Sequence, residues 1–232
     1  MAKKNYYTIE KNKEKIINRK NTNFLDPNLL NKVCYQIRNY PYKIYYPYKD
    51  SERNIIYTND IPQIKLLEIK SYERLTHREI MGALYNMNIE NEMFGDIIIN
   101  NNRYFILIIS NIYDALINAL NTVGRKQVKL IEADIKLLEK YERKYEKKVL
   151  IVSSLRIDTI ISRLIGISRD KMKKLFSNNE IYLNYQICNK SNQILKKEDI
   201  FSIRKHGKYK FKGINKKSKK NNYIIECDKY ID

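Results

Sequence analysis

Five residues in the middle of the chain have the side-chain types of an acid-base or metal site. They are His77, Glu79, Glu90, Glu92 and Asp96. Histidine with carboxylates can transfer protons or bind a divalent cation, which would suit a nuclease or another hydrolase. Catalysis at this group is therefore one hypothesis for the chain.

A structural role explains part of this group without any chemistry. Thr76 can cap a helix that runs to about Met87, with His77 in its first turn and Glu79 completing a capping box. The sequence contains no phosphate-binding Gly-rich loop, nucleophile elbow or synthetase signature. We therefore expect a protein that is not an enzyme and that needs no cofactor or metal.

Charge and cysteine content narrow the class of protein. The 232 residues include 45 Lys and Arg against 26 Asp and Glu, a formal net charge of +19, which is typical of proteins that bind a polyanion such as nucleic acid. Cys34, Cys188 and Cys227 are too few and too scattered for a disulfide framework or a zinc site. No apolar signal region opens the chain, and the longest apolar run, Tyr104–Ile109, is far too short to span a bilayer. We expect a cytoplasmic protein without membrane contact.

The positive charge is concentrated towards the end of the chain. Residues 146–232 hold 21 basic and 9 acidic side chains, whereas residues 1–145 hold 24 and 17. Nine basic residues and no acidic ones lie between Arg204 and Lys220. This stretch predicts a phosphate-binding surface. Lys216–Lys220 alone is equally consistent with a disordered basic tail.

The first 60 residues are expected to be helical and then irregular. Asp26 predicts the cap of a helix that has Pro27 at its first position. Lys43–Tyr57 is rich in Tyr and Ile, which suits short strands. A tyrosine-rich surface that stacks nucleic-acid bases is the rarer alternative.

Residues 61–147 predict an α+β module with elements in the order β-α-β-β-α-β, including a hairpin turn at 100–102. This order is that of the ferredoxin-like fold, which RNA-recognition (RRM-like) modules share. Arg103–Ile106 lacks the glycines of the sheet motif that stacks bases in those modules. A charged helix is predicted over 134–148.

Two short helices after residue 152 are predicted to present basic side chains next to each other. Apolar residues recur at helical spacing from Ile157 to Leu164 and form one stripe of the first helix. Gly166 ends this helix and Ser168 caps the next one. Short strands are expected between residues 181 and 211.

The motifs of this last module resemble the S4 domain, an RNA-binding module named for a ribosomal protein. The resemblance implies an S4 domain with a basic C-terminal extension over residues 148–232, in which the two helices and the turn at Asn184 bind the backbone of folded RNA by its shape. The motifs are Leu155-Arg156-Ile157-Asp158, Ile167-Ser168-Arg169, Ile181-Tyr182-Leu183-Asn184 and Glu198-Asp199-Ile200-Phe201-Ser202-Ile203-Arg204. The candidate RNA contacts are Arg156, Asp158, Arg163, Ser168, Arg169, Lys171, Lys173, Lys174, Asn184, Arg204, Lys205, Gly207, Lys208, Lys210 and Lys212.

Further motifs extend the resemblance to the YlmH family of bacterial S4-domain proteins. The resemblance implies three modules, with boundaries near 60 and 147, and RNA binding on the large ribosomal subunit in ribosome-associated quality control. There the family holds peptidyl-tRNA while a tail is added to a stalled chain. The expected partners are thus ribosomal RNA, tRNA and the large subunit, and the oligomeric state stays open. The motifs are Val152-Ser153-Ser154-Leu155-Arg156, His77-Arg78-Glu79, Gly82-Ala83-Leu84, Gly95-Asp96-Ile97, Val123-Gly124-Arg125 and Phe24-Leu25-Asp26-Pro27.

Two segments depart from the family pattern. Asn178-Asn179 stands where the family usually has a glycine, and asparagine is the next best residue for a left-handed turn. Arg204-Lys205-His206-Gly207-Lys208 replaces an Arg-Gly-Phe-Gly-Arg loop, which makes a close backbone approach at Lys205 less favourable.

Two other functions compete with this reading. The first is a cell-division scaffold that binds a protein partner through its tyrosine-rich N-terminal region. The second is an RNA-modifying enzyme, because pseudouridine synthases and some methyltransferases also carry S4 domains. The sequence contains none of the motifs of their catalytic domains.

Overall fold

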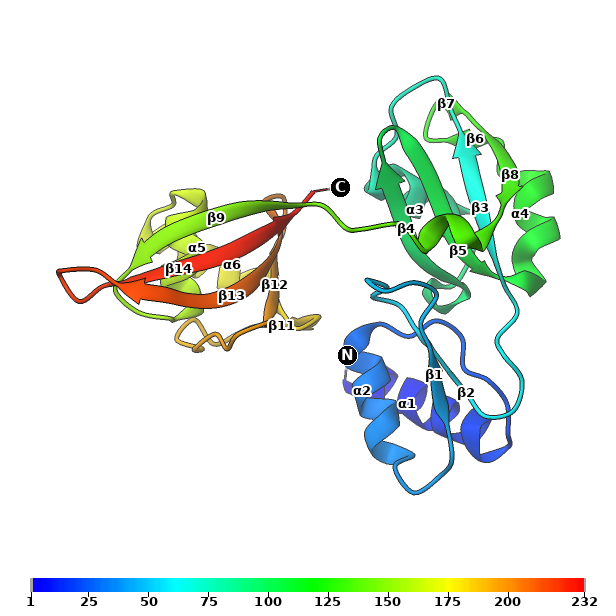
Figure 1. Cartoon of the computed structure of the whole chain (residues 1–232), viewed down its shortest axis with the longest axis horizontal. Helices are drawn as coiled ribbons and strands as arrows, with labels where there is room; N and C mark the ends of the chain where they lie inside the picture. The colour runs from blue at the N-terminus through cyan, green and yellow to red at the C-terminus, as the bar shows by residue number, and fades with distance from the viewer. Residues whose placement is uncertain (1, 232) are drawn as a thin grey trace. The chain divides into compact units, whose positions relative to one another are not determined.

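The computed structural model describes residues 2–231, with side chains from residue 6 onward. These residues divide after Glu142 into two compact units, each with its own sheet and apolar core (Figure 1). Both units combine helices with mainly antiparallel strands, so the predicted α+β class is confirmed. Within the described range, no helix is long and apolar enough to cross a membrane.

The first unit opens with two helices and a small hairpin. As predicted, Asp26 caps the second helix, because its carboxylate accepts hydrogen bonds of 2.9 Å from the backbone N–H groups of Asn28 and Leu29. Apolar side chains of both helices and of the hairpin share one small core. The elements are α1 (Ala2–Ile17), α2 (Pro27–Gln36), β1 (Lys43–Tyr45) and β2 (Ile55–Tyr57).

A four-stranded antiparallel sheet forms the rest of the first unit. Its strand order is β4-β5-β3-β8, and the longer elements run β-α-β-β-α-β along the chain. Asn101 and Asn102 turn the predicted hairpin with φ values of 50° and 60°. The elements are β3 (Ile64–Lys70), α3 (His77–Asn86), η1 (Asn91–Met93), β4 (Phe94–Asn100), β5 (Arg103–Ile109), η2 (Ser110–Ile112), α4 (Tyr113–Ala119), β6 (Thr122–Val123), β7 (Lys126–Gln127), β8 (Lys129–Ala133) and η3 (Ile135–Leu138).

One face of this sheet carries the two helices. Ile80 and Leu84 of α3 and Leu116 of α4 pack on Leu67 and Ile106 from the sheet. All five side chains are almost completely buried. This arrangement follows from the alternation of β5, in which every second residue points to the helices.

The opposite face of the sheet is covered by parts of the chain outside it. Phe24 and Tyr48 from the N-terminal region pack on Phe105 and Leu107, which are 6% and 0% exposed. The fit is close, since a Cβ added at Gly95 would lie 2.7 Å from the Phe24 ring. Both faces of the sheet are therefore buried within the first unit.

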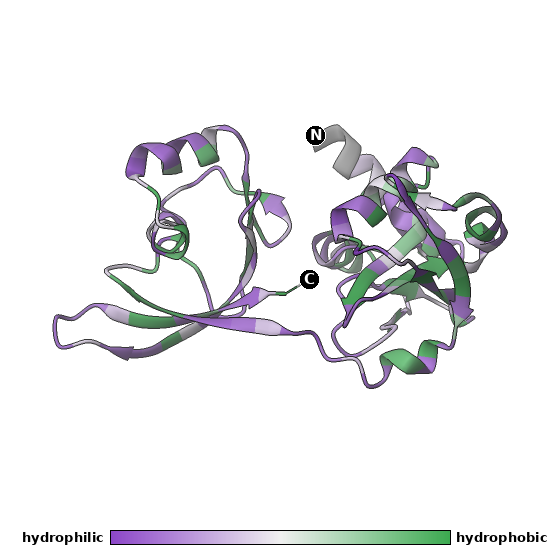
Figure 2. Cartoon of the chain, turned by 90° about the horizontal axis from the view of Figure 1, so that it is seen from above, coloured by the Kyte–Doolittle hydropathy of each residue, from purple (hydrophilic) through white to green (hydrophobic). Residues whose placement is uncertain are grey.

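The second unit is a six-stranded antiparallel sheet with α5 and α6 on one face (Figure 1). The strand order is β11-β10-β12-β13-β14-β9. Figure 2 shows apolar and polar residues mixed along the strands, as expected for a sheet with one buried face. The elements are β9 (Tyr145–Val152), α5 (Ile157–Ile165), α6 (Arg169–Ser177), β10 (Ile181–Leu183), β11 (Gln186–Ile187), β12 (Ile200–Ile203), β13 (Gly207–Lys217) and β14 (Tyr223–Tyr230).

The prediction of a helix over residues 134–148 is wrong. Only the short 3-10 helix η3 forms there, and β9 begins at Tyr145. All eight residues of β9 pair with β14, and the ammonium of Lys147 lies 3.0 Å from the Glu226 carboxylate across the pair. Long-range pairing thus overrides a local composition that favours a helix.

Candidate nucleic-acid interface

Two short helices, α5 and α6, build the candidate interface in the second unit. Ile157, Ile160 and Ile161 are fully buried, which fixes the apolar side of α5 against the sheet. Gly166 ends α5 in the left-handed conformation with φ +64°, and Ser168 caps α6 through a weak 3.4 Å hydrogen bond from the backbone N–H of Lys171. These caps agree with the predicted ones.

An open groove of about 990 Å³ runs along these helices. Its lining combines arginine and lysine side chains with several hydroxyl groups and with the largely buried Met172 and Phe176. Cations and hydroxyls are the groups that hold phosphate and sugar oxygens. The polar lining residues are Ser153, Ser154, Arg156, Asp158, Thr159, Ser162, Arg163, Arg169, Lys173, Asn189 and Ser191.

Arg156 and Asp158 form a two-point ion pair at the entrance to α5. The Nε and Nη2 groups of Arg156 donate to the two carboxylate oxygens at 3.1 and 2.5 Å. The carboxylate raises the pKa of Arg156 and is itself held by the backbone N–H of Thr159 at 2.7 Å. The Arg156 side chain is 44% exposed, so part of it stays accessible to a ligand.

Arg163 and Arg169 line the groove from the two helices, and both are exposed. Neither forms an ion pair with any residue that the structure describes, and the same holds for Lys171 and Lys174 on α6. Lys173 has only a loose contact with Asp170, at 3.9 Å between two highly exposed side chains. These helices therefore carry positive charge that the chain itself does not neutralise.

Asn184 has a structural task in the turn between β10 and β11. Its side-chain amide donates to Asp199 and its carbonyl accepts from the backbone N–H of Ile200, both at 2.9 Å. Asn184 and Tyr185 take left-handed φ values of 48° and 65°. The RNA contact predicted for Asn184 would have to use the exposed edge of an amide that is already bonded.

Lys208, Lys210 and Lys212 lie on β13, on the face of the sheet opposite to the helices. Alternation places them there, because Tyr209 and Phe211 between them are buried against the core that includes α5 and α6. The predicted contacts of these three lysines thus lie apart from the groove.

Internal partners also occupy these lysines. The ammonium of Lys208 lies 4.6 Å from the ring centre of Tyr185. Lys210 and Lys212 lie 2.5 and 2.8 Å from the two carboxylate oxygens of Glu198. Their hydrogen bonds lower the pKa of Glu198 to about 2. Much of the positive charge on this strand is therefore balanced locally.

The β12–β13 hairpin carries Arg204, Lys205 and Gly207. Lys205 has a φ of +68°, a left-handed backbone conformation that residues other than glycine rarely adopt. Gly207 has a φ of +103°. Arg204 and Lys205 are exposed and have no ion pair among the residues described. At the other departure from the family pattern, Asn179 takes the predicted left-handed turn with φ +55°.

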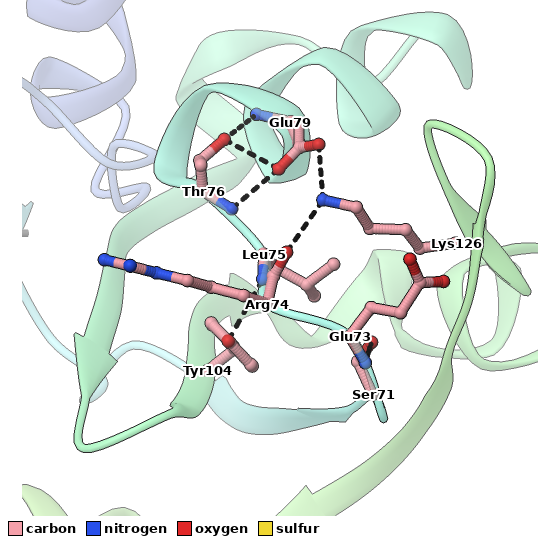
Figure 3. Close-up of polar contacts among 8 residues, drawn as sticks. All are labelled: Ser71, Glu73, Arg74, Leu75, Thr76, Glu79, Tyr104 and Lys126. Carbon is pink, nitrogen blue, oxygen red and sulfur yellow. Dashed lines mark hydrogen bonds and ion pairs between the residues drawn. The ribbon is translucent and has the colours of Figure 1, made fainter.

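Glu79 has a structural explanation (Figure 3). Thr76 and Glu79 form the predicted capping box, and the Glu79 carboxylate also lies 2.7 Å from the Lys126 ammonium, which donates to the backbone carbonyl of Arg74. The Lys126 and Thr76 hydrogen bonds lower the pKa of Glu79 to about 2. A carboxylate of such low basicity is poorly suited to proton transfer near neutral pH.

Asp96, another acid of this group, also has a structural role. Asp96 accepts hydrogen bonds from the Tyr48 hydroxyl at 2.5 Å and from the backbone N–H groups of Glu52 and Arg53. It therefore shapes the loop before β2. Among the described residues no group of three His, Cys, Asp or Glu side chains could hold a metal ion.

The sequence analysis missed the hydroxyl groups of the groove. Thr159 follows Arg156 by three residues and precedes Arg163 by four, a helical spacing that could have indicated a shared face. Ser191 has no such signal. It enters the site because its backbone carbonyl accepts from the Asp158 N–H at 3.2 Å, which ties its loop to the first turn of α5.

Fold and surface together define a class of protein. The chain is a two-unit α+β protein with a cationic, hydroxyl-lined groove in one unit and a sheet closed on both faces in the other. Such a groove is suited to a phosphate backbone, whereas the closed sheet leaves no open platform for stacking bases.

The comparisons name the family. Residues 59–137 match the model of the putative RNA-binding domain in YlmH. The chain is 26% identical over 153 residues to ribosome-associated protein quality control protein P2 of Bacillus subtilis (strain 168). The match covers 66% of this chain and 60% of that relative. The resemblance to the YlmH family is confirmed, and it is carried by residues 59–137, which are similar to that family's putative RNA-binding domain.

A solved structure also resembles the chain. It is the cell division protein ylmH from Streptococcus pneumoniae, with 23% identity and a TM-score of 0.48. The similarity covers 59% of this chain and 95% of that chain.

Proposed function

We propose that the protein is a non-catalytic RNA-binding protein that grips the backbone of folded RNA in the groove along α5 and α6. The observation that carries the proposal is the pair Arg163 and Arg169, which line one groove from two helices and have no ion-pair partner among the described residues. Arginine forks match phosphate oxygens in two-point contacts. The remaining contacts would come from Lys171, Lys173, Lys174, Arg204 and Lys205.

The hydroxyl groups suit RNA in particular. Thr159 and Ser162 lie between the cations of α5, and their hydroxyls donate to Asp158 and to the Ile167 carbonyl. Their oxygens would accept hydrogen bonds from sugar 2′-hydroxyls. Asp158 holds one side of Arg156 in place, so this guanidinium is oriented before any ligand arrives. A fixed fork loses less conformational entropy on binding than a mobile one. We assign Asp158 a positioning role and Arg156 a direct contact.

We further propose that the bound RNA is ribosomal, on the large subunit, with tRNA as a second contact. The name of the Bacillus subtilis relative supports a role at the ribosome in quality control of stalled chains. Residues 148–232 would be the S4 domain, and residues 61–147 would be an RRM-like module. Because Phe105 and Leu107 are covered, this module would not read RNA through its sheet.

Co-sedimentation with ribosomal subunits tests the proposal. The double change Arg163→Gln and Arg169→Gln should abolish pelleting with the large subunit, because it removes both forks and leaves the apolar side of the helices untouched. The matched control is His77→Asn with Glu79→Gln, which alters the alternative catalytic group and should leave pelleting unchanged. If the arginine variant still pellets with the large subunit, the groove is not the RNA-binding site.

Crosslinking in cells identifies the RNA itself. Sequencing of the attached fragments should return one region of large-subunit ribosomal RNA and, at lower yield, tRNA. Recovery of messenger RNA alone would refute the ribosomal part of the proposal. The same arginine variant should lose these fragments.

A further inference from the structure

The first unit has a second surface whose composition suits a nucleic acid. From Pro27 to Lys49 the chain contains no acidic residue, while it contains four basic residues and six tyrosines. Three of these tyrosines are exposed, at 66%, 42% and 55%, and no aliphatic side chain of this segment is among the exposed large apolar residues. The exposed tyrosines are Tyr35, Tyr40 and Tyr46.

These residues lie on the last turn of α2, on the segment that joins α2 to β1, and directly after β1. The Arg38 guanidinium lies 4.7 Å from the centre of the Tyr35 ring and donates to the Tyr35 carbonyl at 3.0 Å. Tyr42, directly before β1, packs on the core beneath α2 and hydrogen-bonds to Cys34 of that helix. Tyr46 directly follows β1. We call Tyr35, Arg38, Tyr40 and Tyr46 the tyrosine surface.

Two exposed tyrosines of this surface have a restricted backbone. Tyr40 precedes Pro41, and Tyr46 precedes Pro47. A residue before proline is restricted to extended conformations, so less backbone freedom remains to be lost on binding. The Tyr40 backbone N–H also donates to the Ile37 carbonyl at 2.8 Å.

The charges around the tyrosine surface are not balanced within the chain. Lys32, Arg38, Lys43 and Lys49 form no ion pair with any residue in the described part of the chain. The acid at one end of the segment, Asp26, is engaged in capping α2. Aromatic rings interleaved with unpaired cations are the composition of surfaces that bind single-stranded nucleic acid.

We propose that the tyrosine surface binds unpaired RNA by stacking bases on Tyr35, Tyr40 and Tyr46 while the surrounding cations contact its phosphates. This site is separate from the groove along α5 and α6 and lies outside the segment that matches the family model. A protein partner is the competing occupant, because tyrosine and arginine are also common in protein interfaces. The absence of exposed aliphatic side chains and of acids in this segment favours the nucleic acid.

Binding of a labelled, unstructured oligouridine of about 12 nucleotides to the full chain tests the proposal, with fluorescence anisotropy as the readout. The double change Tyr35→Leu and Tyr46→Leu should weaken binding by about 30-fold, from two lost stacking contacts at the low end of their range. Tyr35→Phe with Tyr46→Phe keeps the rings and should bind within about threefold of the natural protein. Both tyrosines are exposed, so thermal unfolding should be the same for all three proteins.

Separate outcomes distinguish this proposal from the groove. The Arg163→Gln and Arg169→Gln protein should keep its binding to oligouridine and bind a folded RNA hairpin much more weakly, with a smaller salt dependence. Unchanged oligouridine binding by the leucine variant would overturn the proposal, as would an equal loss in the phenylalanine variant. If a partner captured from cells survives ribonuclease and is lost only in the leucine variant, the occupant is a protein and the proposal is wrong.

Discussion

The dependence of RNA binding on salt gives a quantitative test of the groove. Six cations of the two helices and the adjacent hairpin have no ion pair among the described residues, namely Arg163, Arg169, Lys171, Lys174, Arg204 and Lys205. Each phosphate contact releases a condensed counterion, so log K falls by about 0.9 per contact for each unit of log salt. These six contacts alone contribute about −5 to the slope, which is a loss of about 10³-fold between roughly 50 and 200 mM salt.

Removal of two contacts should change that slope by a known amount. With Arg163→Gln and Arg169→Gln, the slope should fall in magnitude by about 2. Lys210→Gln with Lys212→Gln is the matched control, because it removes the same charge from lysines that already pair with Glu198 on the other face of the sheet. Anisotropy of a labelled RNA hairpin at several KCl concentrations measures each slope. Equal changes in both variants would show that overall charge, and not the groove, drives binding.

Three further predictions concern stability. Phe24→Ala should destabilise the first unit by about 3–5 kcal/mol, because it opens a cavity over the sheet, and urea unfolding would measure this loss. The hydrogen bond from Arg103 lowers the pKa of Glu68 from 4.5 to about 2, so its stabilising contribution is complete above pH 4.5 and is lost as the pH falls towards 2. The melting temperature should fall between pH 4.5 and pH 2, and this fall should be smaller in the Glu68→Gln protein. Lys205→Gly should stabilise the second unit by up to about 1 kcal/mol by relieving its left-handed backbone, and a lower melting temperature would contradict this.

Local signals in the sequence predicted local structure well. Asp26 caps α2, Thr76 and Glu79 form the capping box, and Asn101 with Asn102 turns the hairpin. Each of these features depends on side chains only a few residues apart. Such interactions are visible in the sequence because their geometry is fixed by the backbone of one element.

Contacts between distant segments could not be predicted in this way. The pairing of β9 with β14 joins residues about 80 positions apart and converted a predicted helix into a strand. The ion pairs of Lys210 and Lys212 with Glu198 depend on the path of the chain before β12. The cationic face of α5 was predicted, whereas the loop that brings Ser191 to it was not.

The segment that matches the family model is shorter than the part of the chain that is needed to bury the four-stranded sheet. The segment that matches the family model, residues 59–137, excludes Phe24 and Tyr48 on one side and Leu138 on the other, yet all three lie on the sheet that this segment forms. A fragment cut at those limits would expose Phe105 and Leu107 to water and tend to self-associate. The N-terminal residues thus cover one face of the sheet from within the same chain. Expression of residues 59–137 alone would need another apolar surface to replace that cover.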